Sequence, residues 1–150
     1  MSPSPVPPVK SILVPVDGSE ASQQALAVAA DLARRNRAEV HLLYVIEMPR
    51  SMALDATVEG ELQHAETILE RAETLTEGLG ISVTGDLVQA RQAGHAIVDE
   101  ARERGVDVVI MGVAYDRPYG RFELGSTPRY VMEHASAQVW VIRAPEPSAT

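Results

Sequence analysis

The sequence predicts a single-domain α/β fold in which helices cover both faces of a mostly parallel sheet. Short apolar segments alternate along the chain with longer segments whose apolar residues recur at helical spacing, which is typical of consecutive β-α-β units. The length of 150 residues suits one domain with a continuous core. Proline-rich ends flank this pattern, so we expect a disordered leader over residues 1–9, a folded domain over residues 10–144 and a disordered tail over residues 145–150.

Each element is predicted by its own apolar pattern. A strand buried on both faces is a short, nearly continuous apolar segment, and a helix packed on a sheet carries an apolar stripe at three- and four-residue steps. These patterns predict, in chain order, a strand over residues 11–16, a helix over 20–35, a strand over 39–46, a helix over 58–79, a strand over 81–88, a helix over 92–104, a strand over 106–113, a helix over 128–134 and a strand over Gln138–Arg143.

Capping residues mark several of these boundaries. Ser19 suits the N-cap of the first helix, and Gly80 and Gly105 suit the C-caps of the second and third. Gly85 interrupts the third strand and is a candidate for a β-bulge. In such sheets a ligand binds at the carboxyl ends of the strands where the strand order reverses, so we expect function in the loops after the first, second and fourth strands.

The composition excludes several classes of function. The chain has 13 basic and 21 acidic residues and a formal net charge of −8, which argues against non-specific nucleic-acid binding and against docking on anionic membranes. No apolar stretch approaches the roughly 18 residues of a membrane span. The absence of cysteine excludes disulfides and thiolate metal sites and is consistent with the reducing cytoplasm, where we expect the protein.

Gly125-Ser126-Thr127-Pro128 is the strongest local signal. Gly125 allows close backbone approach to a ligand, Ser126 or Thr127 can cap the following helix, and the exposed N–H groups of a helix start attract phosphate. Three arginines nearby in the sequence are expected to add positive charge: Arg117, Arg121 and Arg129. The alternative, an ordinary N-cap after a surface loop, is about equally expected from spacing alone.

Asp17 is the second signal, because it follows the first strand directly. Its carboxylate is placed to meet a ligand ribose, base or metal at the carboxyl end of the sheet. A turn-forming aspartate is the more common alternative.

Catalytic motifs are missing from the sequence. It contains no P-loop lysine motif, no GxSxG elbow and no HxxxH or HExxH spacing. We therefore predict no catalytic residue and no metal-binding residue, and at most slow, incidental nucleotide hydrolysis.

Five segments together resemble the universal stress proteins, and the resemblance extends over residues 9–144. They are KSILVPVDGSEASQQAL, YVIE, VDVVIMGV, GRFELGSTPRYVMEHA and QVWVIR. The resemblance implies a Rossmann-like sandwich of the adenine nucleotide alpha hydrolase-like type, with five parallel strands in the order 3-2-1-4-5, usually dimeric.

One branch of this family binds ATP through the pattern Gly, two residues, Gly, nine residues, Gly, then Ser or Thr. Gly112 and the Gly125-Ser126 pair match this pattern, and Tyr115 stands where it has the middle glycine. By this resemblance, the expected nucleotide-binding residues are Pro15, Val16, Asp17, Val45, Met111, Gly112, Gly125, Ser126 and Thr127. Tyr115 either obstructs the terminal phosphates or stacks on the ligand and encloses it.

The resemblance implies a stress-response sensor or regulator that binds adenine nucleotide. ATP is the first expectation, AMP or ADP the alternatives, with or without Mg. Homodimerisation is expected through the edge strand Gln138–Arg143, where Trp140 is a core or dimer contact. Two other readings stay open: a nucleotide-free member of the family that acts through dimerisation and an unknown protein partner, and a nucleotide hydrolase.

Overall fold

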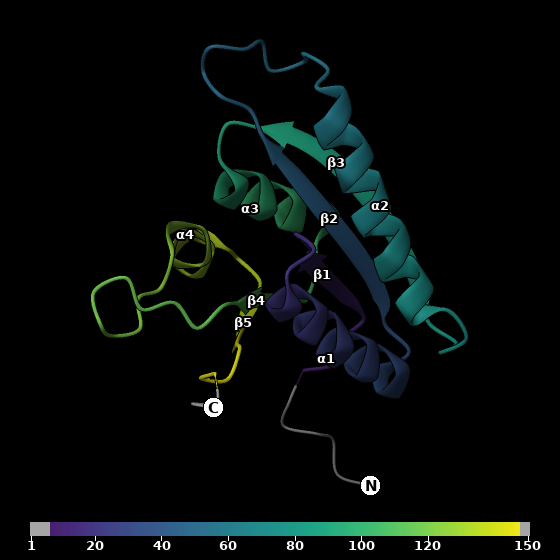
Figure 1. Ribbon diagram of the computed structural model, residues 1–150. Coiled ribbons are helices and arrows are strands. Elements are labelled where there is room, and N and C mark those ends of the chain that lie inside the picture. Colours follow the sequence, from purple (N-terminus) through teal and green to yellow (C-terminus); the bar gives the residue numbers. More distant parts are fainter. Residues whose placement is uncertain (1–6, 148–150) are drawn as a thin grey trace, which may run out of the picture.

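The computed structural model describes residues 7–147 (Figure 1). The strands are β1 (Ser11–Pro15), β2 (Glu39–Glu47), β3 (Ser82–Ala90), β4 (Val108–Val113) and β5 (Gln138–Arg143), and the helices are α1 (Glu20–Asn36), α2 (Glu59–Thr76), α3 (Ala93–Arg104) and α4 (Ser126–His134). The chain alternates strictly between strand and helix, as predicted.

All strand pairs are parallel, and the sheet has the order β3-β2-β1-β4-β5. This order confirms the predicted topology. It places β1 at the centre, with β2 on one side and β4 on the other, so the chain reverses its direction of travel across the sheet next to β1.

The core has two layers, one on each face of the sheet. Ile12 and Val14 of β1 pack with Leu26 of α1 and Leu69 of α2 on one face. Leu13, between them in the sequence, packs on the other face against the side chains that α3 and α4 contribute, which include Ile97 and Val131. Because side chains alternate along a strand, this single central strand anchors both layers (Figure 1).

Two of the predicted caps are confirmed. The Ser19 side chain accepts a hydrogen bond from the Ser22 backbone N–H at 3.1 Å and so caps α1. Gly105 ends α3 in the left-handed conformation, with φ 62°, and its N–H returns to the last turn of the helix.

The predicted end of α2 is wrong. The helix ends at Thr76 and its C-cap is Glu77, so Gly80 lies beyond it. Leu75 and Leu79 continue the apolar stripe in the sequence but are 60% and 41% exposed, and they border a hollow beside α1. The apolar stripe therefore extends beyond the last residue of the helix.

The predicted bulge at Gly85 is also absent. Pairing between β2 and β3 continues without interruption from Glu39 opposite Ser82 to Glu47 opposite Ala90. Gly85 faces α2, where a β-carbon would lie 2.8 Å from a carboxylate oxygen at the flexible end of Glu73 and 3.4 Å from a Leu69 methyl group.

The ends of the described chain differ in their structural role. Val9 was placed in the leader, but it is 8% exposed and belongs to the core layer under α1 and α2. The backbone N–H groups of Lys10 and Ser11 both donate to Asp107, which fixes the start of β1 beside β4. Residues 7–8 of the predicted leader and 145–147 of the predicted tail have no regular secondary structure, and residues 1–6 and 148–150 lie outside the described residues.

Within residues 7–147, none of the helices combines the length and apolar character that crossing a bilayer requires.

Candidate functional site

A cavity of about 300 Å³ opens at the carboxyl ends of β1, β2 and β4, on the face of the sheet that carries α3 and α4. This is the position at which the strand order reverses and at which ligands of open α/β sheets bind. Its wall is formed by Pro15, Val16, Asp17, Ser22, Leu43, Val45, Glu47, Ala93, Ile97, Met111, Gly112, Thr127 and Pro128.

Most of the residues predicted from the sequence meet in this wall. They come from four separate parts of the chain: Pro15, Val16 and Asp17 after β1, Val45 on β2, Met111 and Gly112 on β4, and Thr127 on α4. Gly125 and Ser126 are the two predicted residues that do not line the cavity.

The start of α4 differs from the expectation in two respects. Gly125 is the N-cap of a helix that begins at Ser126, so neither Ser126 nor Thr127 supplies a side-chain cap. Gly125 has φ −66° and ψ 169°, a conformation open to any residue, and the nearest atom to a β-carbon there is 3.8 Å away. A side chain at this position would therefore fit without backbone strain.

Asp17 forms the turn that its sequence position suggested, and it also lines the cavity. One carboxylate oxygen accepts a hydrogen bond from the Ser19 backbone N–H at 2.9 Å, which forms the turn into α1. The Asp17 backbone N–H donates to the Ser22 hydroxyl at 3.2 Å. The turn uses one carboxylate oxygen, and the other is left as an acceptor at the exposed edge of the cavity wall.

Glu47 is a site residue that sequence reasoning missed. Its carboxylate oxygen Oε1 accepts a hydrogen bond from the Ala93 backbone N–H at 3.0 Å, and both residues line the cavity. Gln92, the N-cap of α3, makes no side-chain cap hydrogen bond, so the end of β2 provides the cap instead. The only signal in the sequence was the position of Glu47 at the end of an apolar strand.

The wall is acidic. Asp17 and Glu47 are the charged residues among those that line the cavity, and both are carboxylates. The three arginines expected to add positive charge lie elsewhere. Arg117 bonds the Gly120 carbonyl and approaches Glu146, Arg121 pairs with Glu123, and Arg129 donates to the Leu124 carbonyl.

Tyr115 lies in the loop between β4 and α4 and does not line the cavity. Its ring stacks on Phe122, with the ring centroids 5.7 Å apart and an angle of 16° between the planes. The Arg143 guanidinium carbon lies 4.7 Å from the Tyr115 ring centroid, a cation–π arrangement. Tyr115 therefore packs the loop onto the end of β5.

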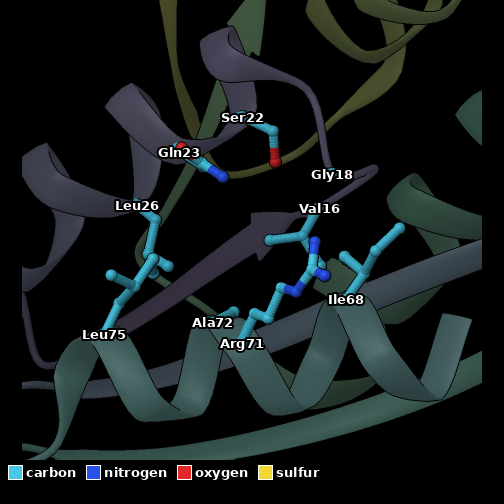
Figure 2. Close-up of a pocket in the computed structure, with 9 residues that line it drawn as sticks. All are labelled: Val16, Gly18, Ser22, Gln23, Leu26, Ile68, Arg71, Ala72 and Leu75. Atoms are coloured by element: carbon cyan, nitrogen blue, oxygen red, sulfur yellow. The ribbon is translucent and has the colours of Figure 1, made fainter.

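A second, much smaller cavity lies on the other side of the β1–α1 turn, between α1 and α2 (Figure 2). It shares Val16 and Ser22 with the first, and Arg71 of α2 extends toward the turn at Val16 and Gly18. Its volume of about 30 Å³ holds little more than a water molecule, so it is not a site for a nucleotide.

No group of three or more metal-ligating side chains occurs in the described part of the chain. The polar groups in the wall of the first cavity are the Asp17 and Glu47 carboxylates, the Ser22 and Thr127 hydroxyls and the first turn of α4. Such a wall can bind a small polar molecule through hydrogen bonds and provides no evident nucleophile and base pair.

Solved structures share this fold. A universal stress protein from Archaeoglobus fulgidus superimposes with a TM-score of 0.76 at 24% identity, covering 89% of this chain and 98% of that one. The corresponding protein from Lactobacillus plantarum gives a TM-score of 0.74 at 25% identity, with 92% and 100% covered.

Three further matching structures contain a nucleotide. A universal stress protein from Archaeoglobus fulgidus is in complex with dAMP (TM-score 0.71, 21% identity, 90% of this chain and 98% of that chain covered). A family member from Arabidopsis thaliana has AMP bound (TM-score 0.66, 17% identity, 91% and 92% covered). A third universal stress protein is in complex with cAMP (TM-score 0.70, 20% identity, 91% and 98% covered).

Sequence comparison gives the family directly. A universal stress protein of Methanocaldococcus jannaschii is 27% identical over 143 residues, which cover 91% of this chain and 84% of that protein. Residues 8–143 match the sequence profile of the Universal stress protein family. The chain therefore belongs to the universal stress protein family.

Proposed function

We propose that this protein binds an adenine nucleotide in the cavity at the carboxyl ends of β1, β2 and β4. The observation that carries the proposal is that one cavity joins the Asp17 turn to Thr127 and Pro128 in the first turn of α4. The matching structures with AMP, dAMP and cAMP support an adenine nucleotide as the ligand class.

The polar groups suggest how the nucleotide lies. The phosphate meets the N–H groups at the start of α4 and the Thr127 hydroxyl, where the helix dipole favours an anion. The ribose hydroxyls donate to the free carboxylate oxygen of Asp17. The base lies toward Val45, beside the apolar side chains of Leu43 and Ile97.

ATP is the form that we propose first, with AMP and ADP as alternatives. The cavity wall has two carboxylates and no basic side chain, so no positive side chain offsets the negative charge of a triphosphate. ATP is therefore expected to bind as its magnesium complex, since the cation then neutralises the charge that the wall leaves unpaired.

We further propose that the protein is a cytoplasmic sensor or regulator in the stress response and not an enzyme. Homodimerisation through β5 fits this role. β5 lies at the edge of the sheet, its side chains from Val139 to Ile142 are half-buried, and an edge strand with free backbone groups pairs readily. A monomer in sedimentation analysis at micromolar concentration would refute the dimer.

The acidic wall also favours a second candidate function. A nucleotide-free member of the family would act through dimerisation and a protein partner, and would need no positive charge in the cavity. Native mass spectrometry of the freshly purified protein separates the two candidates. Co-purified adenine nucleotide supports the first. Bare protein that also fails to bind AMP, ADP or magnesium ATP in calorimetry supports the second.

A further inference from the structure

Glu47 lies at the solvent-exposed end of the cavity, where one hydrogen bond orients its side chain. It is the last residue of β2, and its Oε1 atom is held at 3.0 Å by the backbone N–H of Ala93, the first residue of α3. Within the described residues, this is the one hydrogen bond that the Glu47 side chain makes. The second carboxylate oxygen, Oε2, is therefore positioned but not used.

The N-termini of α3 and α4 both reach the cavity, and they differ because the Glu47 carboxylate occupies only that of α3. At α3, Ala93 already binds a negative charge, so a phosphate placed there would meet a carboxylate at close range. At α4, the N-cap is a glycine with no side chain to cap the helix. A nucleotide therefore binds with its phosphate at α4 and its base at the end formed by β2 and α3, beside Glu47.

We propose, on the basis of the proposed function, that Glu47 selects the base of the nucleotide. A carboxylate oxygen accepts hydrogen bonds and cannot donate one. Oε2 accepts an N–H of the exocyclic amino group of adenine. It repels the C6 carbonyl oxygen that hypoxanthine has in place of the amino group, so the N1–H is the one donor left to hypoxanthine on that edge of the base. Glu47 is thus a specificity-determining residue that favours an amino-bearing base.

The wild-type protein tests this first, because no substitution is involved. The three probes are AMP, purine riboside monophosphate, which has only hydrogen at C6, and IMP. Calorimetry is expected to give the affinity order AMP, then purine riboside monophosphate, then IMP, with AMP at least tenfold tighter than IMP. Equal affinities for AMP and IMP would overturn the role of Glu47.

Glu47→Gln tests the residue itself. The amide oxygen of glutamine can keep the hydrogen bond from Ala93, and the amide nitrogen then presents a donor to the ligand. We expect AMP to bind more weakly, IMP to bind more tightly and the ratio of their dissociation constants to fall at least tenfold. Glu39→Gln, at the opposite end of β2 and with its side chain 65% exposed, is the matched control and should leave the ratio unchanged.

The outcomes separate this inference from the proposed function. If the wild-type protein binds no adenine nucleotide, the proposed function is wrong, and the proposed selection of the base by Glu47 is wrong as well. If the wild type binds AMP and Glu47→Gln keeps the wild-type ratio of AMP to IMP, only the role of Glu47 is wrong. If Glu47→Gln does not fold, the wild-type affinity order decides.

Discussion

A methyl group on Gly112 would lie 2.0 Å from the backbone carbonyl oxygen of Ala21, so the first turn of α1 packs directly on the backbone of β4. No side chain can occupy this space without moving one of the two elements. Gly112 and the Asp17 turn before α1 line the same cavity. The resemblance implies a ligand contact at Gly112, and the structure shows a packing role, because the absence of a side chain lets α1 approach β4.

Gly112→Ala is expected to destabilise the fold. The new methyl group meets backbone atoms, which cannot rotate away, so the cost should reach or exceed the roughly 1–3 kcal/mol typical of overpacking. Urea titration measures it. Gly60→Ala is the matched control, because nothing lies within 4 Å of a β-carbon there and α2 should gain about 0.5–1 kcal/mol from the change. Equal stability of the two variants would contradict the packing role.

Asp17→Asn should weaken nucleotide binding and leave the fold nearly unchanged. The asparagine oxygen can still accept the hydrogen bond from the Ser19 N–H, so the turn is kept while the charged acceptor is lost. We expect binding of AMP to weaken by about 1.5–3 kcal/mol in calorimetry, the range for a hydrogen bond to a charged group. An unchanged affinity for AMP would show that the ribose does not contact Asp17.

Tyr115→Gly is expected to loosen the loop before α4 without changing the affinity for AMP. The ring packs on Phe122 and Arg143 and does not line the cavity, so its removal frees the loop and no ligand contact is lost. Hydrogen exchange should become faster in residues 115–124. A large fall in AMP affinity would show instead that Tyr115 holds the ligand.

Tyr44 is expected to make folding stability fall at alkaline pH. Burial raises the pKa of Tyr44 above its ordinary value of 10.0, and the negative charges of Asp17 and Glu61 raise it further. Above pH 10 the unfolded chain loses this proton while the folded chain keeps it. The contribution of Tyr44 to the free energy of unfolding is therefore complete below pH 10, and it is lost as the pH rises through the pKa of Tyr44 in the folded state.

Urea titrations at about pH 9 and about pH 11 measure this effect as the difference between wild type and Tyr44→Phe. The variant should lose less stability than the wild type over this range. Tyr119→Phe is the control, since Tyr119 is 85% exposed. If both variants lose as much stability as the wild type between these pH values, Tyr44 does not cause the loss of stability.

Much of the fold could be predicted because its signals are local. The apolar segments located all five strands, and Ser19 and Gly105 marked helix ends through their own side-chain and backbone chemistry. The strand order came from the family resemblance. The end of α2 could not be predicted from its stripe, because Leu79 keeps the helical spacing although the helix ends at Thr76.

The residues of the candidate site that lie at strand ends could be predicted from the sequence. The residue that lies there through a contact with a distant part of the chain could not. Pro15, Val16 and Met111 lie at strand ends that the fold itself brings together. Glu47 acts through Ala93, which is 46 residues away in the sequence, and no local pattern records that pair. Arg129 was expected near the phosphate from its proximity in sequence, but its side chain turns to the Leu124 carbonyl.

Calorimetric titration of the wild-type protein and of Thr127→Val with AMP tests the central claim most directly. Valine keeps the shape of the threonine in the cavity wall and removes the hydroxyl that should face the phosphate. The wild type should bind one AMP per chain, and the variant should bind it about tenfold or more weakly, since a hydrogen bond to a charged group contributes roughly 1.5–3 kcal/mol. Equal affinities, or no saturable binding by the wild type, would contradict a nucleotide site in this cavity.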